Sequence, residues 1–164
     1  MRSQMQLETW ERAPEFNIGS AVNNSCKDKS IVRGLAYHRK VYKRLHEWVA
    51  KNPDLGYKFI EEPWLRRTSG PRKMCQPDGI LFDQFTGGAV VVEAKLNWKD
   101  GRDEKLINTY LAAARSAYQL SITWPLLITS NVRGYKGEPL AGLRQIDRAF
   151  EWRPGMLTPV MLLL

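Results

Sequence analysis

Apolar residues recur at helical spacing over residues 31–51, and charged residues fill the opposite side. One stripe collects the apolar positions of this segment: Ile31, Leu35, Val41, Tyr42, Leu45, Trp48 and Val49. Ser30 is suited to the N-cap, and Asn52–Pro53 ends the pattern. His38 lies on the apolar stripe. We therefore expect an amphipathic helix that turns His38 toward the interior.

Periodic segments farther along the chain predict strands and a second helix. Residues 56–67 alternate loosely and predict a first strand, which Pro63 interrupts. Residues 103–120 carry apolar side chains at helical spacing, and Asp103 suits the N-terminal turn of that helix. The short apolar run 125–129 is typical of a buried strand. A strand–helix–strand crossover over these segments predicts an α/β fold.

The two ends of the chain are less regular. Residues 1–30 show no sustained period and are interpreted as an N-terminal extension before a single domain over residues 31–164. Residues 160–164 predict either a strand added to the sheet or an interface patch, and they are too short to cross a bilayer. Residues 140–152 predict a C-terminal helix with three inward side chains: Leu143, Ile146 and Phe150.

Three polar residues fall on a predicted β-hairpin. Asp78 precedes the apolar run Ile80–Phe82, and Glu93–Ala94–Lys95 ends the run that begins at Val90. The turn signal Phe85–Thr86–Gly87–Gly88 reverses the chain between them, because glycine adopts the positive φ of tight hairpins. Asp78 should therefore lie roughly opposite Glu93 and Lys95, which share one face of their strand.

A carboxylate within an apolar run is costly to bury without a partner. Mg²⁺ or Mn²⁺ bound by Asp78, Glu93 and the Ala94 carbonyl would offset that cost, and Lys95 could then orient or deprotonate a water. The alternative is an edge hairpin with an Asp in a turn and a surface Glu–Lys pair.

Length and composition limit the class of protein. A chain of 164 residues with a net charge of +8 suits one basic domain. Met1–Trp10 lacks the apolar core of a signal peptide, and Cys26 and Cys75 lack metal-type spacing. These features predict a cytoplasmic protein with no membrane partner.

Positive charge is concentrated in one part of the sequence. Residues 27–73 hold thirteen Lys and Arg against five Asp and Glu, whereas the rest holds twelve of each. Phosphate backbones are the natural counterpart of such a region, although many proteins have a basic face that only keeps them soluble. We expect DNA as the partner, bound by these side chains: Arg39, Lys43, Arg66, Arg67, Arg72, Lys73 and Gln119.

The pattern Pro77–Asp78 followed by Glu93–Ala94–Lys95 resembles the PD-(D/E)xK nuclease superfamily. The resemblance covers about residues 31–130 and implies a restriction-endonuclease-like αβββαβ core, in which helices flank a central mixed sheet. It also implies that Asp78, Glu93 and the Ala94 carbonyl bind the metal, and that Lys95 assists the attacking water.

The segment Gly34–Leu35–Ala36–Tyr37–His38 is similar to the Gly-x-x-x-His signature of the RecB-type branch. That resemblance makes His38 a further metal ligand and catalytic residue, and an imidazole ligand favours Mn²⁺ over Mg²⁺. The alternative is a buried neutral imidazole with a satisfied hydrogen bond. The chain departs from the branch after Gln119, where Thr123 stands in place of a frequent Tyr.

These observations favour a divalent-metal-dependent deoxyribonuclease with His38, Asp78, Glu93 and Lys95 as its site. Two alternatives stay open. One is a non-catalytic nucleic-acid-binding module of the same fold, and the other is a structure-selective endonuclease similar to Holliday-junction resolvases. A homodimer or a larger nucleic-acid-processing assembly is compatible with either. The sequence leaves the cleavage position and the strandedness of the substrate open.

Overall fold

A computed structural model describes residues 7–17, 28–98, 104–133, 135, 137–151, 153 and 159–164. In this part of the chain, a mixed five-stranded sheet has the order β2-β5-β6-β7-β8. Neighbours β2, β5 and β6 are antiparallel, whereas β6, β7 and β8 are parallel. The expected α/β class with a mixed sheet is thus confirmed. The strands are β2 (Tyr57–Glu61), β5 (Gly79–Asp83), β6 (Gly88–Lys95), β7 (Thr123–Thr129) and β8 (Val160–Leu163).

Three strand predictions agree with this sheet. The turn between β5 and β6 falls at residues 84–87, where Gly87 has a φ of +71°. All seven residues of β7 are buried, as expected for the apolar run 125–129. The C-terminal run becomes strand β8 at the edge of the sheet, which selects the first of its two interpretations.

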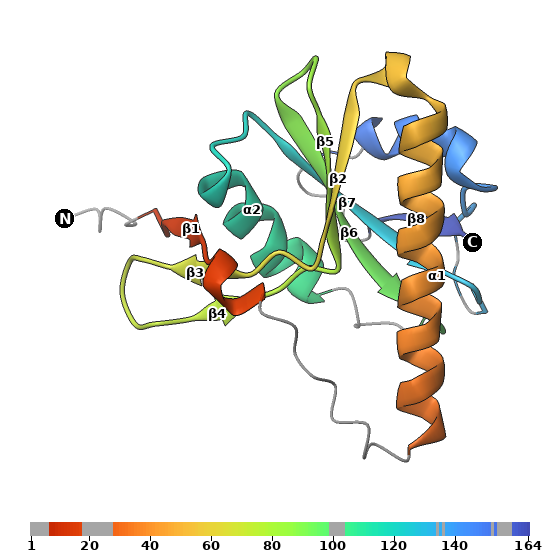
Figure 1. Cartoon of the computed structure of the whole chain (residues 1–164), viewed down its shortest axis with the longest axis horizontal. Coiled ribbons are helices and arrows are strands. Elements are labelled where there is room, and N and C mark those ends of the chain that lie inside the picture. The colour runs from red at the N-terminus through yellow and green to blue at the C-terminus, as the bar shows by residue number, and fades with distance from the viewer. Residues whose placement is uncertain are drawn as a thin grey trace.

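Helix α1 (Lys29–Lys51) crosses one face of the sheet, with Tyr37, Val41, Tyr42 and Leu45 buried (Figure 1). The N-cap is Asp28, whose carboxylate accepts a hydrogen bond from the Ser30 amide at 2.8 Å. The prediction of Ser30 as the cap is therefore wrong, because Asp28 offers an equally good acceptor two residues earlier.

The predicted apolar stripe of α1 is only partly buried. The first turns of the helix project beyond the sheet (Figure 1), so Ile31 remains 47% exposed. Periodicity identifies the face of a helix, but the length of the sheet beneath it decides how much of that face is covered.

The opposite face of the sheet is covered by η3 (Leu106–Tyr110), a π-helical turn, and α2 (Leu111–Ala117) (Figure 1). The helix predicted over residues 103–120 is confirmed across 104–117, and Asp103 lies outside the described residues. Thr123 Oγ1 donates to the Leu111 carbonyl at 3.0 Å and ties α2 to the start of β7. Leu106, Tyr110, Leu111 and Ala114 form the inner face as expected.

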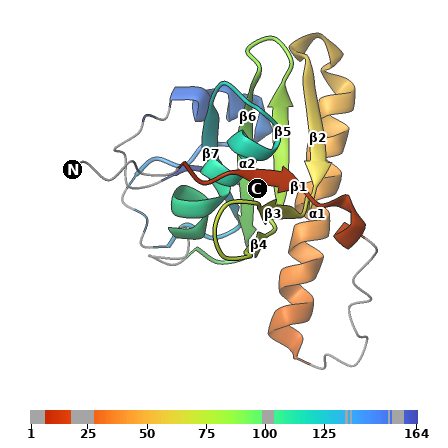
Figure 2. The ribbon, with the colours of Figure 1, turned by 90° about the vertical axis from the view of Figure 1, so that its left-hand side faces the viewer.

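The strand predicted over residues 56–67 is confirmed in its first part as β2, and the chain breaks at Pro63 as expected. Its continuation to residue 67 is wrong, because residues 65–67 belong to a second sheet. Beyond β2 the chain bends at Glu62–Pro63 and continues as β3 (Leu65–Arg67), which pairs with β1 (Trp10–Arg12) and β4 (Met74–Cys75). Proline lacks an N–H and cannot continue a ladder through its own position. Figure 2 shows this small sheet on the same side as α2.

Residues before α1 contribute to the core. Trp10 is 5% exposed, Ala13 is fully buried, and the Trp10 amide donates to Ser116 Oγ of α2 at 2.8 Å. Their interpretation as an extension without regular structure is therefore wrong for β1. A three-residue strand is too short to produce a recognisable period. The short helices η1 (Pro14–Asn17) and η2 (Pro53–Leu55) complete these connections.

The C-terminal helix predicted over residues 140–152 is η4 (Leu143–Glu151), a 3₁₀-helix beside α1. Leu143 and Ile146 are buried as expected, and Phe150 stacks at 6.0 Å between ring centroids on Tyr57. Trp152 lies outside the described residues. Among the described helices, none combines the length and apolar character needed to span a bilayer.

Candidate active site

The candidate site lies in a notch where β5 leaves the central strand β6. Gly79, the first residue of β5, pairs with Val92, so residues 93–95 extend past it. The N–H and C=O of one strand residue point to the same side, and those of Ala94 face the notch. Asp78 Oδ2 accepts from the Ala94 amide at 2.7 Å, and His38 Nε2 lies 2.9 Å from the Ala94 oxygen. His38 of α1 and Asp78 before β5 therefore both contact the backbone of Ala94 in β6.

Two carboxylates, the half-buried Asp78 and the buried Glu93, dominate the electrostatics of the notch. Side-chain exposure is 15% for Asp78 and 8% for Glu93. Burial raises the pKa of Asp78 to about 6, against the opposing effects of the Ala94 amide and Lys95. Burial, followed by repulsion from Asp78, raises the pKa of Glu93 to about 7, again against Lys95. Without an added cation, the pair resists carrying two negative charges at once.

One carboxylate oxygen has no partner. Glu93 Oε1 contacts Lys95 Nζ, whereas Glu93 Oε2 is buried without a hydrogen-bond partner among the described residues. An unsatisfied buried oxygen is rare in folded proteins and needs a physical explanation. A bound cation would provide one.

His38 is held as a neutral imidazole. Burial lowers its pKa, repulsion from Lys95 lowers it further, and the Ala94 carbonyl opposes both effects. Because a carbonyl only accepts hydrogen bonds, Nε2 carries the proton and donates to Ala94. Nδ1 lies 3.8 Å from Asp78 Oδ1. A neutral imidazole is the form that binds metals.

The donor set fits a hard divalent cation that keeps part of its water shell. The described residues contain no group of three or more His, Cys, Asp and Glu side chains arranged to hold a metal. Mg²⁺, however, is commonly bound through one or two carboxylates with waters and substrate phosphates. Asp78, Glu93 and the Ala94 carbonyl meet that requirement. Because Nε2 of His38 donates to the Ala94 oxygen, the nitrogen left with a lone pair for a cation is Nδ1.

A third acid, Glu62, lies beside the pair and was missed by the sequence interpretation. Its amide donates to the Asp78 carbonyl at 2.9 Å, and its Oε1 accepts from the Tyr42 hydroxyl at 3.0 Å. Its φ of +41° is a strained conformation for a residue with a side chain. The only sequence signal is its position before Pro63, which indicates a bend but no role.

Two of the predicted DNA-binding arginines are engaged by acids of the N-terminal segment. Arg66 donates to Glu11 at 2.7 Å and to Glu15 at 2.8 Å. Arg67 donates to Glu8 at 2.8 Å. These glutamates lie outside the basic window 27–73, and pairing of β1 with β3 brings them to it. The excess charge counted along the sequence is therefore partly neutralised in the fold.

The other predicted DNA-binding residues are dispersed. Arg39, next to His38, is exposed on α1, and Lys43 lies 3.8 Å from Glu47 on the surface of the same helix. Arg72 and Lys73 are exposed in the loop between β3 and β4. Gln119 follows α2 near the β5–β6 turn, where the Ser121 amide donates to Gly87. That turn is at the opposite end of β6 from Glu93, so Gln119 is not brought to the notch.

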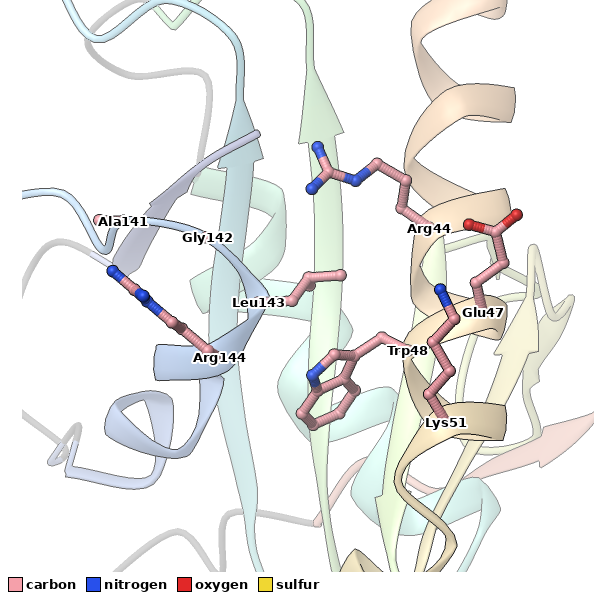
Figure 3. A pocket seen from close by; sticks show the side chains of 8 residues that line it. All are labelled: Arg44, Glu47, Trp48, Lys51, Ala141, Gly142, Leu143 and Arg144. Carbon is pink, nitrogen blue, oxygen red and sulfur yellow. The ribbon is translucent and has the colours of Figure 1, made fainter.

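A separate cavity of about 370 Å³ lies between the second half of α1 and the start of η4. Figure 3 shows Trp48 and Leu143 extending toward each other across it, with Lys51 on the helix beside them. Its lining includes none of the notch residues. Substitutions here can therefore serve as controls for substitutions around the acid pair.

Comparison of the chain with protein-family models, with curated proteins and with solved structures finds no match.

Proposed function

We propose that this chain is a divalent-metal-dependent nuclease that hydrolyses phosphodiester bonds of DNA on a restriction-endonuclease-like fold. The Asp78–Glu93 pair carries the proposal, because Glu93 Oε1 contacts Lys95 while the buried Oε2 has no hydrogen-bond partner among the described residues. Isolated carboxylates are costly to bury, and a structural role for both would require more hydrogen bonds than they make. The order α1, β2, β5, β6, α2, β7 supports the proposed αβββαβ core.

In this proposal, Asp78, Glu93 and the Ala94 carbonyl hold the cation, with His38 as an additional ligand. Bound Mg²⁺ or Mn²⁺ would supply an activated water and neutralise charge on the phosphate. The Lys95 side chain is 29% exposed, so its ammonium can reach a water or a phosphate oxygen at the open side of the notch. Neutral His38 adds no charge that would repel the cation.

DNA would be held mainly by its phosphates. Arg39 and Lys43 on α1, with Arg72 and Lys73 in the β3–β4 loop, are exposed cations and would make these contacts. Such contacts position the strand without reading its sequence, and they weaken as salt increases.

The direct test is cleavage of plasmid and single-stranded DNA in Mn²⁺, in Mg²⁺ and in EDTA. We expect cleavage only with a divalent ion, and a loss of about 10²-fold or more in Asp78→Asn, Glu93→Gln and Lys95→Ala. Glu47→Gln is the matched control, because this glutamate is exposed on α1 and should leave cleavage unchanged.

DNA binding measured in EDTA, compared with cleavage measured in a divalent ion, separates the proposed nuclease from its two alternatives. Wild type that binds DNA without cleaving it in any divalent ion would be a non-catalytic module. Cleavage confined to four-way junctions by a dimeric species would instead favour the resolvase-like alternative.

A further inference from the structure

A second cavity, of about 340 Å³, lies between the segment that leads into Asp78 and the η3 turn. The segment leading into Asp78 forms one wall, with Lys73 and Gln76, and the η3 turn forms the other, with Lys105, Thr109 and Tyr110. Trp64, at the start of the small sheet, completes the lining. The cavity is therefore built where the small sheet meets the helix that follows β6.

Tyr110 links this cavity to the notch. Only 9% of Tyr110 is exposed, and burial raises the pKa of its hydroxyl, with further contributions from Glu93, Cys75 and Asp78. Tyr110 belongs to η3, which packs against β6, the strand that carries Glu93. Gln76, two residues before Asp78, is fixed by donating to the Glu62 carbonyl at 2.8 Å. A ligand in the cavity would therefore lie next to a phosphate bound at the notch.

The chemistry of the cavity suits a nucleotide. Trp64 and Tyr110 provide aromatic surface, and Thr109 provides a hydroxyl. Lys73 and Lys105 are exposed at its rim, and neither forms an ion pair with another described residue. A volume of about 340 Å³ is at the small end of ligand sites, which span roughly 300–1,000 Å³. It has room for one base.

We propose that this cavity is a subsite for one unpaired nucleotide adjacent to the cleaved phosphate, so that the substrate is single-stranded DNA or an unpaired DNA end. This inference rests on the proposed nuclease function for the meaning of the adjacent phosphate. A base within a duplex is stacked and paired, and it enters a pocket only when it is free of its partner. The two lysines would neutralise the phosphates on either side of the bound base.

The test measures DNA binding in EDTA by fluorescence anisotropy, where no cleavage occurs. The probes are a labelled single strand, the same strand with one abasic site moved along it, and the matching duplex. We expect the single strand to bind more tightly than the duplex, and one abasic position to weaken binding about 5- to 150-fold.

Two variants place the effect in the cavity. Thr109→Trp fills it from η3, and Lys105→Glu reverses a charge at its rim; both should remove the preference for the single strand. Lys51→Glu, in the cavity between α1 and η4 (Figure 3), is the matched charge control and should keep it.

Equal affinity for duplex and single strand in wild type, or an unchanged preference in both Thr109→Trp and Lys105→Glu, would overturn the subsite. Cleavage in Mn²⁺, measured separately, tests the nuclease function. If wild type prefers the single strand but never cleaves DNA, the nucleotide subsite stands and the proposed nuclease function is rejected.

Discussion

Glu93→Gln should stabilise the metal-free protein at alkaline pH. Above its ordinary pKa of 4.5, Glu93 is ionised in the unfolded chain, whereas the folded protein keeps it protonated up to about pH 7. Unfolding in that window releases a proton, so this group makes stability fall as pH rises from about 4.5 through 7. A neutral glutamine of the same shape removes that dependence.

The magnitude follows from the raised pKa. An increase from 4.5 to about 7 corresponds to about 3 kcal/mol at about 1.4 kcal/mol per tenfold change in proton affinity. Glu93→Gln should therefore be more stable than wild type by about 3 kcal/mol at pH 8, and nearly equal to it at pH 4.5. For a domain of this size, that difference is about 6–12 °C in melting temperature.

Metal should reverse the order of the two proteins. A ligand that binds only the folded state at 1,000 times its Kd adds about 4.1 kcal/mol of stability, which exceeds the advantage of about 3 kcal/mol that the variant has without metal. Mn²⁺ should stabilise wild type at pH 8 and leave Glu93→Gln nearly unchanged, because the variant loses a carboxylate ligand. Urea unfolding followed by tryptophan fluorescence, at pH 4.5 and 8 and with EDTA or Mn²⁺, measures all four conditions.

Glu47→Gln is the control, since this exposed residue should change stability by less than about 0.5 kcal/mol at either pH. The reasoning would be refuted if Glu93→Gln proved less stable than wild type at pH 8 without metal. Equal stabilisation of wild type and variant by Mn²⁺ would refute the metal assignment.

Three further predictions concern other parts of the chain. Gly88→Ala would place a Cβ 2.6 Å from Trp124 and should destabilise the protein by about 1–3 kcal/mol. Gly34→Ala in α1 meets nothing within 4 Å and should stabilise the protein by about 1 kcal/mol. Thermal melting that ranks the two variants in the opposite order would contradict the packing. His38→Ala should weaken Mn²⁺ binding about tenfold and Mg²⁺ binding less, as calorimetry can show; equal losses would exclude an imidazole ligand. If the proposed DNA contacts hold, Arg39→Ala should lower the salt slope of DNA binding by about one, while Arg66→Ala should not, because Arg66 is already paired; the opposite result in salt titrations would reject that assignment.

Local patterns were sufficient for much of the fold. A hairpin is a short-range reversal, so alternation and Gly87 placed Asp78 beside residues 93–95 before any tertiary information. The buried strand β7 followed in the same way from its apolar run. The segment 56–67 was misread because Pro63 ends a ladder without indicating that the next strand joins another sheet.

The sequence by itself determined which chemical groups the hairpin carries and on which face Glu93 and Lys95 lie, because a strand has a period of two. The tertiary structure decided how far these groups are buried and which partners they contact. Contacts between segments more than 50 residues apart bring His38 to the Ala94 carbonyl and Glu11 to Arg66. Burial and charge pairing are properties of this assembled environment. Only the fold neutralises Arg66 and buries a Glu93 oxygen that has no partner in the part of the chain that the structure describes.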